Sequence, residues 1–266
     1  MDILTIMYIT FGVLIFTLGG VLGSFFECLA DRSVKGISIT KGRSYCPQCG
    51  HVLGVFDLFP IFSWLFLGGK CRYCKCKIPA RHVIVETVSA VSFLLIYIVF
   101  GVMQQNLPLM LLNLFMISLL IPSSLTDLDT QTVENIYFIL MAIGWAVYVP
   151  FSGDIKGTII NGLIGGLAIP TFLMIVAIIM EKVLHKDALG GADIKILFSI
   201  GLILGWKLNI LNLMLTCFVG LFFIAIMKKV QKTDEVMFPL FPAIAVSTLI
   251  TTLVGNQIIN AYLSLF

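Results

Sequence analysis

Three aspartates lie where apolar runs of the chain meet polar segments. Asp127 and Asp129 end one run, and Asp193 opens another. An ionised aspartate at the centre of a membrane helix costs about 2.5 to 3.5 kcal/mol, so it requires a partner, water or a function. Two carboxyl groups that share a site do not both ionise readily: one keeps a proton while the other accepts one from water. Such a pair can activate water against a peptide carbonyl and protonate the leaving amine.

Asp127 and Asp193 are the candidate catalytic pair. Residues two apart on a helix point to nearly opposite faces, so only one of Asp127 and Asp129 can belong to the pair. We choose Asp127, which lies nearer the membrane, and leave Asp129 as a helper or capping residue. Asp193 follows Leu189-Gly-Gly-Ala192, whose small residues allow close approach. Any one of these aspartates alone could be an N-cap or a surface charge, and Lys195 could neutralise Asp193 or contact lipid phosphates.

Four cysteines have the spacing of a metal site. They form two CxxC pairs with 21 residues between them: Cys46 with Cys49, and Cys71 with Cys74. Two such turns can bring four thiolates onto one tetrahedral zinc ion. His51 and Cys76 are near enough to replace a ligand, but are second choices beside a complete set of thiolates. The alternative is two disulfides, which a reducing compartment disfavours. A loop this small buries little apolar surface, so the zinc would be structural.

The composition places these residues in a polytopic membrane protein. Of 266 residues 59% are hydrophobic and 12% charged, and the mean hydropathy is +1.06. These values exclude a soluble globule, a disordered chain, a coiled coil and a cytosolic nucleic-acid binder. The fold class is all-α, with about eight transmembrane helices of roughly 20 residues. We expect them near 4–26, 84–103, 107–125, 136–151, 157–180, 193–205, 208–227 and 238–264, the sixth being short. The first lacks a basic leader, so we expect a retained helix rather than a cleaved signal peptide.

Lysine and arginine orient these spans. Segment 27–82 holds nine of the seventeen basic residues and should face the cytoplasm. Alternating the remaining loops leaves only Lys156 and Lys207 outside, so fifteen basic residues lie inside against two. Both termini then lie outside the cytoplasm. Asp127 and Asp193 fall on the cytoplasmic side, where they can meet despite the 66 positions between them.

The predicted organisation has three parts: a first transmembrane helix at 1–26, a cytoplasmic cysteine loop at 27–82, and a seven-helix domain at 83–266. The apolar stretch 57–69 inside the loop is too short to cross a membrane and should lie against its surface or against the helices. Small residues four apart allow close helix packing. Such pairs are Gly19 with Gly23, Gly162 with Gly166, and Gly201 with Gly205.

Several of these motifs together resemble the type IV prepilin peptidase family of intramembrane aspartic enzymes, over nearly the whole chain. Gly23-Ser-Phe25 is similar to a family signature, and the CxxC pairs flank Asp57-Leu-Phe-Pro60 and Gly69-Lys-Cys-Arg72 as in family members. Asp127-Leu-Asp129 resembles the segment with the first catalytic aspartate, and Gly190-Gly-Ala-Asp193 resembles the GxGD element with the second. The sequence departs from the family at Ala192, in place of the second glycine, and at Glu134-Asn135, in place of Pro-Asp.

The resemblance implies an enzyme of the prokaryotic inner membrane that cuts the leader peptide from type IV prepilins or pseudopilins on the cytoplasmic side. It also implies N-methylation of the new amino terminus with S-adenosylmethionine as donor, carried by the cysteine loop and adjoining helices. Glu27 and Glu86, at the cytoplasmic mouths of the first two spans, are candidates to hold the donor or the amine. An ion pair of Glu27 or Glu86 with Arg32 or Arg81 is the alternative.

Two other interpretations remain open at this point. In the first, the protein is a cation transporter in which Asp127, Asp129 and Asp193 bind the ion and the zinc loop is regulatory; membrane acids are common in ion pathways. Transporter sites usually lie near the bilayer midplane, however, whereas these acids gather at one face. In the second, the protein is a peptidase without methyl transfer. Membrane lipid is an expected partner and nucleic acid is not, and the sequence leaves the oligomeric state open.

Overall fold

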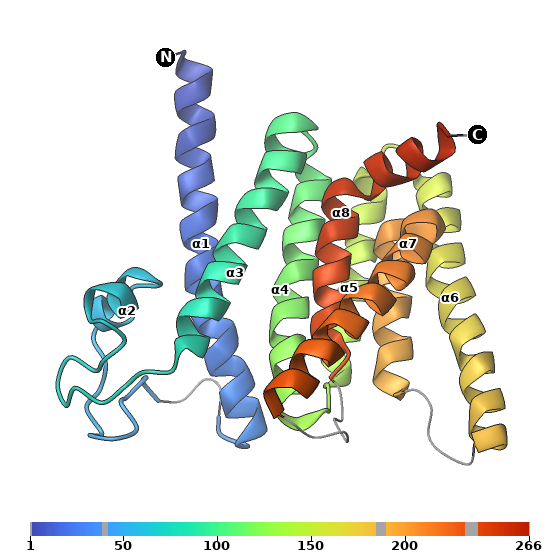
Figure 1. Ribbon diagram of the computed structural model, residues 1–266. Coiled ribbons are helices and arrows are strands. Elements are labelled where there is room, and N and C mark those ends of the chain that lie inside the picture. Colours follow the sequence, from blue (N-terminus) through green and yellow to red (C-terminus); the bar gives the residue numbers. More distant parts are fainter. Residues whose placement is uncertain (1, 39–41, 185–189, 232–238, 266) are drawn as a thin grey trace. The chain divides into compact units, whose positions relative to one another are not determined.

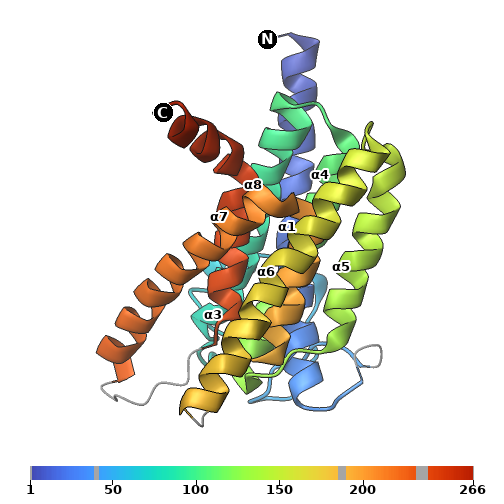
Figure 2. The ribbon, with the colours of Figure 1, turned by 90° about the vertical axis from the view of Figure 1, so that its right-hand side faces the viewer.

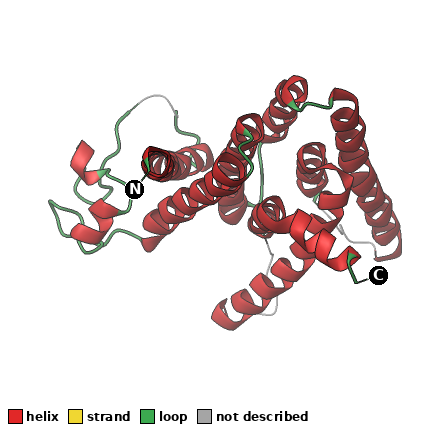
Figure 3. Cartoon of the chain, turned by 90° about the horizontal axis from the view of Figure 1, so that it is seen from above, coloured by secondary structure: helices red, strands yellow, loops and turns green. Residues whose placement is uncertain are grey.

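The computed structural model of the protein describes residues 2–38, 42–184, 190–231 and 239–265. Within these ranges the chain consists of helices and loops without a strand (Figure 3). The predicted all-α class is therefore confirmed. Contacts divide the chain into two compact units, residues 1–106 and residues 107–266. The predicted three-part division at 1–26, 27–82 and 83–266 stays a prediction.

Unit 1 is built on two helices that pack side by side, α1 (Ile3–Val34) and α3 (Ala80–Ile96), which continues as the π-helical segment η2 (Tyr97–Met103) (Figure 1). Gly19 and Gly23 face α3. An added Cβ would lie 2.9 Å from the Ala90 Cα at Gly19 and 2.9 Å from the Glu86 Cα at Gly23. The close approach expected from these glycines is confirmed, because any side chain would force the helices apart.

The loop between α1 and α3 contains two short helices and two similar turns. The short helices are η1 (Val55–Asp57) and α2 (Phe62–Phe66). Each turn is closed by a single β-bridge, Tyr45 with Val52 in one and Lys70 with Lys77 in the other. Pro60 of the apolar stretch reaches α1, where a Cβ added to Gly20 would lie 3.3 Å from its Cβ. The stretch therefore lies against the helices, one of the two predicted placements.

Unit 2 contains the remaining helices. They are α4 (Leu107–Thr130), α5 (Asn135–Tyr148) with η3 (Val149–Phe151), α6 (Ile155–Leu184), α7 (Gly191–Gln231) and α8 (Phe241–Leu263). Helix α7 packs on α5, α6 and α8, and α4 packs on α5 and α8. The core consists of fully buried apolar side chains such as Met116, Leu120, Met141, Ile196, Ile200 and Ile244.

Helix α7 reverses direction at Gly205, which has φ 74° and ψ 174° (Figure 2). In a straight helix, residues twelve apart would be separated by about 18 Å. Asn209 Nδ2 nevertheless donates to the carbonyl of Leu197, twelve positions earlier, at 3.3 Å. Glycine suits the turn because this φ is unfavourable for L-residues with side chains. A Cβ at Gly205 would also lie 2.4 Å from Asn161 Nδ2.

Six of the described helices are long and apolar enough to cross a membrane, counting α7 once, and the segment Asn135–Phe151 is a shorter apolar helix. Because α7 turns back at Gly205, its two arms correspond to the predicted spans 193–205 and 208–227. The helices thus agree with the expected number of about eight spans. Helix α1 continues to Val34, eight residues past the predicted end of the apolar span. The apolar run marks the part of the helix that can cross a membrane, and the more polar turns after it are also helical.

Candidate functional site

Asp127 lies in the last turn of α4 and its side chain is buried. Its Oδ2 accepts a hydrogen bond of 3.0 Å from the main-chain N–H of Phe241, the first residue of α8. The first N–H groups of a helix have no partner within the helix, so a carboxylate is a favourable acceptor there. Oδ2 is thus held by the start of α8.

Asp193 lies in the first turn of α7 and is half-buried. The carboxylates of Asp193 and Asp127 interact electrostatically, and the main chain of Gly190 hydrogen-bonds the Asp193 side chain. A Cβ at Gly190 would lie 3.0 Å from Asp193 Oδ2, so a small residue is required there. The two predicted aspartates therefore come from different helices to one end of unit 2. Leu189, just before this segment, and the basic residues Lys41, Lys186 and Lys232 lie outside the described residues.

Two other polar residues near this pair are directed elsewhere. Asp129 is exposed on the last turn of α4, which agrees with its exclusion from the pair. Lys195 Nζ donates to Asn135 Oδ1 at 2.9 Å, so it links the start of α7 to the start of α5. The roles considered for Lys195 from the sequence, neutralising Asp193 or contacting lipid phosphates, stay predictions beside this contact between helices.

The cysteine turns in unit 1 have the same backbone pattern. Cys46 N–H donates to the His51 carbonyl and Cys71 N–H to the Cys76 carbonyl, at 2.9 and 2.8 Å. The residue after the second cysteine of each turn has positive φ, 68° at Gly50 and 62° at Lys75. His51 and Cys76 therefore occupy equivalent positions, two residues after the second cysteine of each pair.

The sulfur atoms of Cys46, Cys71, Cys74 and Cys76 all lie within 4.8 Å of one another. The Sγ of Cys46 is 3.8 Å from that of Cys74 and 3.6 Å from that of Cys76. A tetrahedral site with metal–sulfur bonds of about 2.3 Å has sulfur atoms about 3.8 Å apart. The cluster can therefore hold a metal ion. Three of the four predicted ligands belong to it, Cys76 is the fourth member, and Cys49 is exposed beside it.

Protonation differs strongly among these thiols. The main-chain N–H groups of Cys49 and Gln48 lower the pKa of Cys46 to about 6. The hydrogen bond with Cys74, together with burial, raises the pKa of Cys76 to about 12. At Cys49 the N–H of His51 favours the thiolate, but loss of hydration and the neighbouring thiols raise the pKa to about 11. The metal-free cluster thus keeps protons at neutral pH that a bound dication would release.

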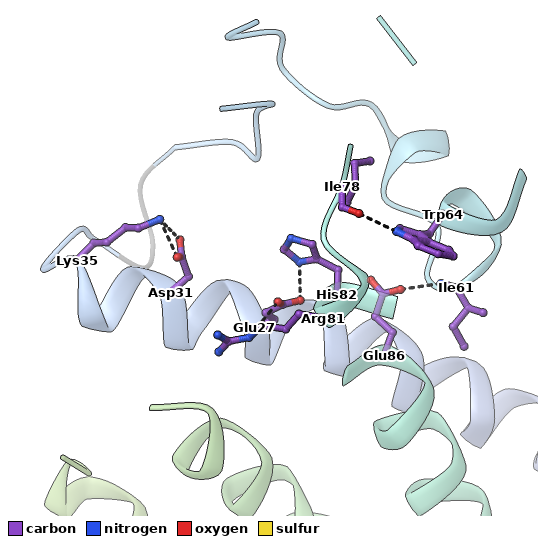
Figure 4. A network of polar contacts seen from close by, with 9 residues as sticks. All are labelled: Glu27, Asp31, Lys35, Ile61, Trp64, Ile78, Arg81, His82 and Glu86. Atoms are coloured by element: carbon purple, nitrogen blue, oxygen red, sulfur yellow. Dashed lines mark hydrogen bonds and ion pairs between the residues drawn. The ribbon is translucent and has the colours of Figure 1, made fainter. Parts of the chain in front are cut away.

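Glu27 and Glu86, predicted to hold a methyl donor, are buried near the ends of α1 and α3 that adjoin the cysteine loop (Figure 4). Glu27 contacts His82 Nδ1 at 2.6 Å and Arg81 Nε at 3.6 Å, and Glu86 Oε2 accepts the Ile61 N–H at 2.7 Å. The alternative of an ion pair between Glu27 and Arg81 is present. Glu27 thus joins α1 to α3, and Glu86 joins the loop to α3. The binding of a methyl donor by either glutamate stays a prediction.

Comparisons with known proteins match both units. The bacterial peptidase A24 N-terminal domain matches residues 17–100, and the type IV leader peptidase family matches residues 114–225. A prepilin leader peptidase/N-methyltransferase of Bacillus subtilis is 30% identical over 256 residues, which cover 95% of this chain and 98% of the relative. The chain belongs to the type IV leader peptidase family. The resemblance inferred from the motifs is thus confirmed.

Other relatives within the family carry the same name. A Myxococcus xanthus protein is 30% identical over 204 residues, 74% of this chain and 57% of the relative. A Pseudomonas aeruginosa protein is 28% identical over 222 residues, 83% of this chain and 74% of the relative. This leader peptidase family member thus spans less than two thirds of the Myxococcus protein but almost all of the Bacillus protein. No solved structure matched the chain.

The family match covers both candidate sites. Asp127 and Asp193 lie inside the peptidase range, and the cysteines and both glutamates lie inside the N-terminal range. Sequence reasoning missed the N–H of Phe241, which carries no sequence signal because it belongs to the main chain. It also ranked Cys76 second, although the equivalence of Cys76 and His51 can be read from the two CxxC pairs. His82 and Arg81 follow the loop directly, and their pairing with Glu27 needed the packing of α1 on α3.

Proposed function

We propose that the chain is a membrane-embedded aspartic endopeptidase that removes the leader peptide from prepilins or pseudopilins and then methylates the new amino terminus. The family and the names of its relatives support both activities. The structural observation that supports the peptidase proposal is the placement of Asp127, in the last turn of α4, and Asp193, in the first turn of α7, at one end of unit 2, near enough for their charges to interact. Two carboxyls that share a site can hold one proton between them, which is the arrangement that an aspartic enzyme uses to hydrolyse a peptide bond.

In the proposed reaction, one aspartate is ionised and the other carries the shared proton. The ionised carboxylate takes a proton from water, whose oxygen attacks the carbonyl carbon of the scissile peptide bond. The protonated partner donates to the carbonyl oxygen, which gives a tetrahedral diol. The C–N bond then breaks as the nitrogen accepts the proton that the first carboxylate took from water, and a diol hydroxyl returns a proton to the partner carboxylate. Because Oδ2 of Asp127 is held by the Phe241 N–H, Oδ1 is the atom assigned to the water or to the shared proton.

The proposed location is the cytoplasmic face of a prokaryotic inner membrane. The excess of lysine and arginine in the cysteine loop supports this orientation, since positive residues are enriched in cytoplasmic loops. In this orientation Asp127 and Asp193 open to the cytoplasm. A prepilin would place its leader at that face and its apolar helix beside the membrane spans.

For the cysteine cluster we propose zinc in a structural role. Thiolates are the preferred ligands of zinc in structural sites, and a closed set of four leaves no position for a substrate. The loop buries few large side chains, since Val55, Phe56 and Phe66 are exposed, so a metal would supply much of its stability. Cys46, Cys71, Cys74 and either Cys76 or Cys49 would hold the ion.

For methylation we propose S-adenosylmethionine as donor, which supplies an electrophilic methyl group. The amine product of cleavage is the acceptor, so the two activities act in sequence. Glu27 joins α1 to α3 through His82 and Arg81, and Glu86 holds Ile61 of the loop on α3. Any contact of the donor with these glutamates is secondary to that positioning role.

The experiment is leader cleavage by the purified protein in liposomes, with a prepilin as substrate. We expect Asp127→Ala and Asp193→Ala each to abolish cleavage and Asp129→Ala, the exposed control, to retain it. Mass spectrometry of the product with and without S-adenosylmethionine should show a difference of one methyl group. Cleavage by either active-site variant would refute the pair, whereas cleavage without added mass would leave a peptidase alone.

A further inference from the structure

Fully buried polar side chains gather on the second arm of α7 and on α8, inside segments apolar enough to span a membrane. We call them the polar seam. Each is 0% exposed: Asn209, Asn212, Ser247, Thr248 and Thr251. In lipid such groups must find partners within the protein, because hydrocarbon offers none.

Part of this demand is met inside unit 2. Asn209 Nδ2 donates to the carbonyls of Gly165 and Leu197, at 2.9 and 3.3 Å. Thr248 Oγ1 donates to Asn212 Oδ1 at 3.3 Å, which joins α8 to α7. The orientation of the Asn209 amide follows from its contacts, since only its NH₂ group can donate to two carbonyls.

Four polar atoms of the seam have no hydrogen-bond partner among the described residues: Asn209 Oδ1, Asn212 Nδ2, Ser247 Oγ and Thr251 Oγ1. Leaving a buried polar group unsatisfied costs about 1 to 3 kcal/mol. Several such groups in one bundle would remove a large part of the stability of a typical domain. Something else must therefore satisfy them.

The chemistry of these atoms identifies the ligand. Neither a lipid nor a partner protein can reach atoms that are completely buried. A cation would be repelled by the NH₂ group of Asn212, which is a donor, and an anion by the carbonyl oxygen of Asn209, which is an acceptor. The ligand therefore has to be able both to donate and to accept hydrogen bonds. Ser247 and Thr251 lie one helical turn apart, where Cβ atoms are about 5 to 6 Å from each other and a single small molecule can bridge two hydroxyls.

We propose that ordered water molecules occupy the polar seam and bridge Asn209, Asn212, Ser247 and Thr251. A buried water typically makes about three hydrogen bonds to groups that are otherwise unsatisfied. Because Asn209 also holds Leu197, one turn after Asp193, the water would tie the two arms of α7 together. The water thus stabilises the turn at Gly205, where the second arm of α7 folds back against the first.

The test is the thermal stability of the full chain in nanodiscs, with Thr251→Val and Ser247→Ala singly and together. Each substitution removes a hydroxyl and nearly preserves the shape. A water bridge predicts that each single variant lowers the Tm by about 2 to 4 °C. It also predicts that the double variant loses less than the sum, because the first substitution already breaks the bridge.

The control is Thr10→Val on α1, whose exposed hydroxyl bonds back to the Ile6 carbonyl at 2.8 Å and should change the Tm little. Radiolytic labelling gives a second readout, since hydroxyl radicals from trapped water oxidise neighbouring side chains. Ile244 is 0% exposed and lies one helical turn before Ser247 and Thr248 on α8, so bulk water does not reach it and its labelling should fall in the double variant. A seam without water predicts that each single variant raises the Tm. That rise, strictly additive losses of Tm in the double variant, or an unlabelled Ile244 in the wild type would each overturn the proposal.

Discussion

The main-chain N–H of Phe241 donates to Asp127 Oδ2 at 3.0 Å across 114 positions of sequence. This bond joins the last turn of α4 to the first turn of α8. It is a contact between a side chain and a helix start, and it fixes one oxygen of a buried carboxylate. Asp127 therefore has a structural role in addition to its proposed catalytic one.

The two roles can be separated by comparing Asp127→Asn with Asp127→Ala. Both variants lose the ionisable carboxyl, so we expect leader cleavage to fall by at least about 10²-fold in each. Asparagine keeps an oxygen for the Phe241 N–H, whereas alanine leaves a buried donor unpaired, which costs about 1 to 3 kcal/mol of unfolding free energy. Chemical denaturation should thus rank the alanine variant lower. Equal stability of the two would show that the bond contributes nothing.

Cys76 should matter more than Cys49 for metal binding. The Cys76 sulfur belongs to the group with sulfur atoms within 4.8 Å of one another, and Cys49 does not. We expect Cys76→Ser to lower zinc affinity by at least about tenfold, because it removes a thiolate ligand and a tenfold loss corresponds to only about 1.4 kcal/mol of binding free energy. Cys49→Ser should lower it less. Competition with a chelator measures the zinc affinity of both variants. A larger loss of affinity in Cys49→Ser than in Cys76→Ser would show that the ligands are the four cysteines of the two CxxC pairs.

The loop should lose stability in acid through Asp57. Burial opposes ionisation of this carboxyl, but the Gly54 N–H and the Arg72 guanidinium, 2.6 Å away, lower its pKa. A folded-state pKa below the unfolded value of about 3.9 stabilises the loop above that pH, and the effect is lost as the pH falls through the folded value.

Asp57→Asn is the matched variant for this effect. With zinc removed from both proteins, we expect the wild type to be more stable than Asp57→Asn by a constant amount between about pH 5 and 7. The difference should shrink below about pH 4. Hydrogen exchange of the loop amides measures it, and a difference that persists in strong acid would contradict the role of the charge.

Gly205→Ala should destabilise unit 2. Alanine at positive φ costs about 1 to 2 kcal/mol, and its Cβ would lie 2.4 Å from Asn161 Nδ2. Gly153→Ala is the control, because Gly153 has φ 80° but nothing lies within 4 Å of the added Cβ. The loss of Tm should be larger at Gly205 than at Gly153. Equal losses would mean that Asn161 moves aside without cost.

Glu27→Gln should weaken the contact between α1 and α3. The substitution removes the charge that faces His82 and Arg81. Breaking a fully buried ion pair costs about 3 to 5 kcal/mol of unfolding free energy. We expect a smaller cost here because both partners of Glu27 are half-exposed. We expect a lower Tm with leader cleavage retained. Mass spectrometry then reports on methylation, and a loss of methylation at unchanged Tm would point to direct contact with the donor.

The sequence by itself determined the helical membrane class of the protein, the positions of its apolar helices and the candidate residues. Apolar runs of fixed length dictate helices in lipid, because every backbone group has to be satisfied within its own segment. The glycine pairs and the CxxC spacing likewise carry local information, which is why Gly19 and Gly23 pack closely as expected and three of the four predicted cysteines lie in the cluster.

Only the tertiary structure decided which groups meet. The Phe241 N–H belongs to the main chain and has no letter in the sequence, and the partners of Glu27 and Glu86 depend on how α3 packs on α1. Cys76 joined the metal cluster because the two turns face each other in space. The reversal at Gly205 and the polar seam arise in the same way, since long-range contacts depend on the three-dimensional path of the chain and not on local spacing.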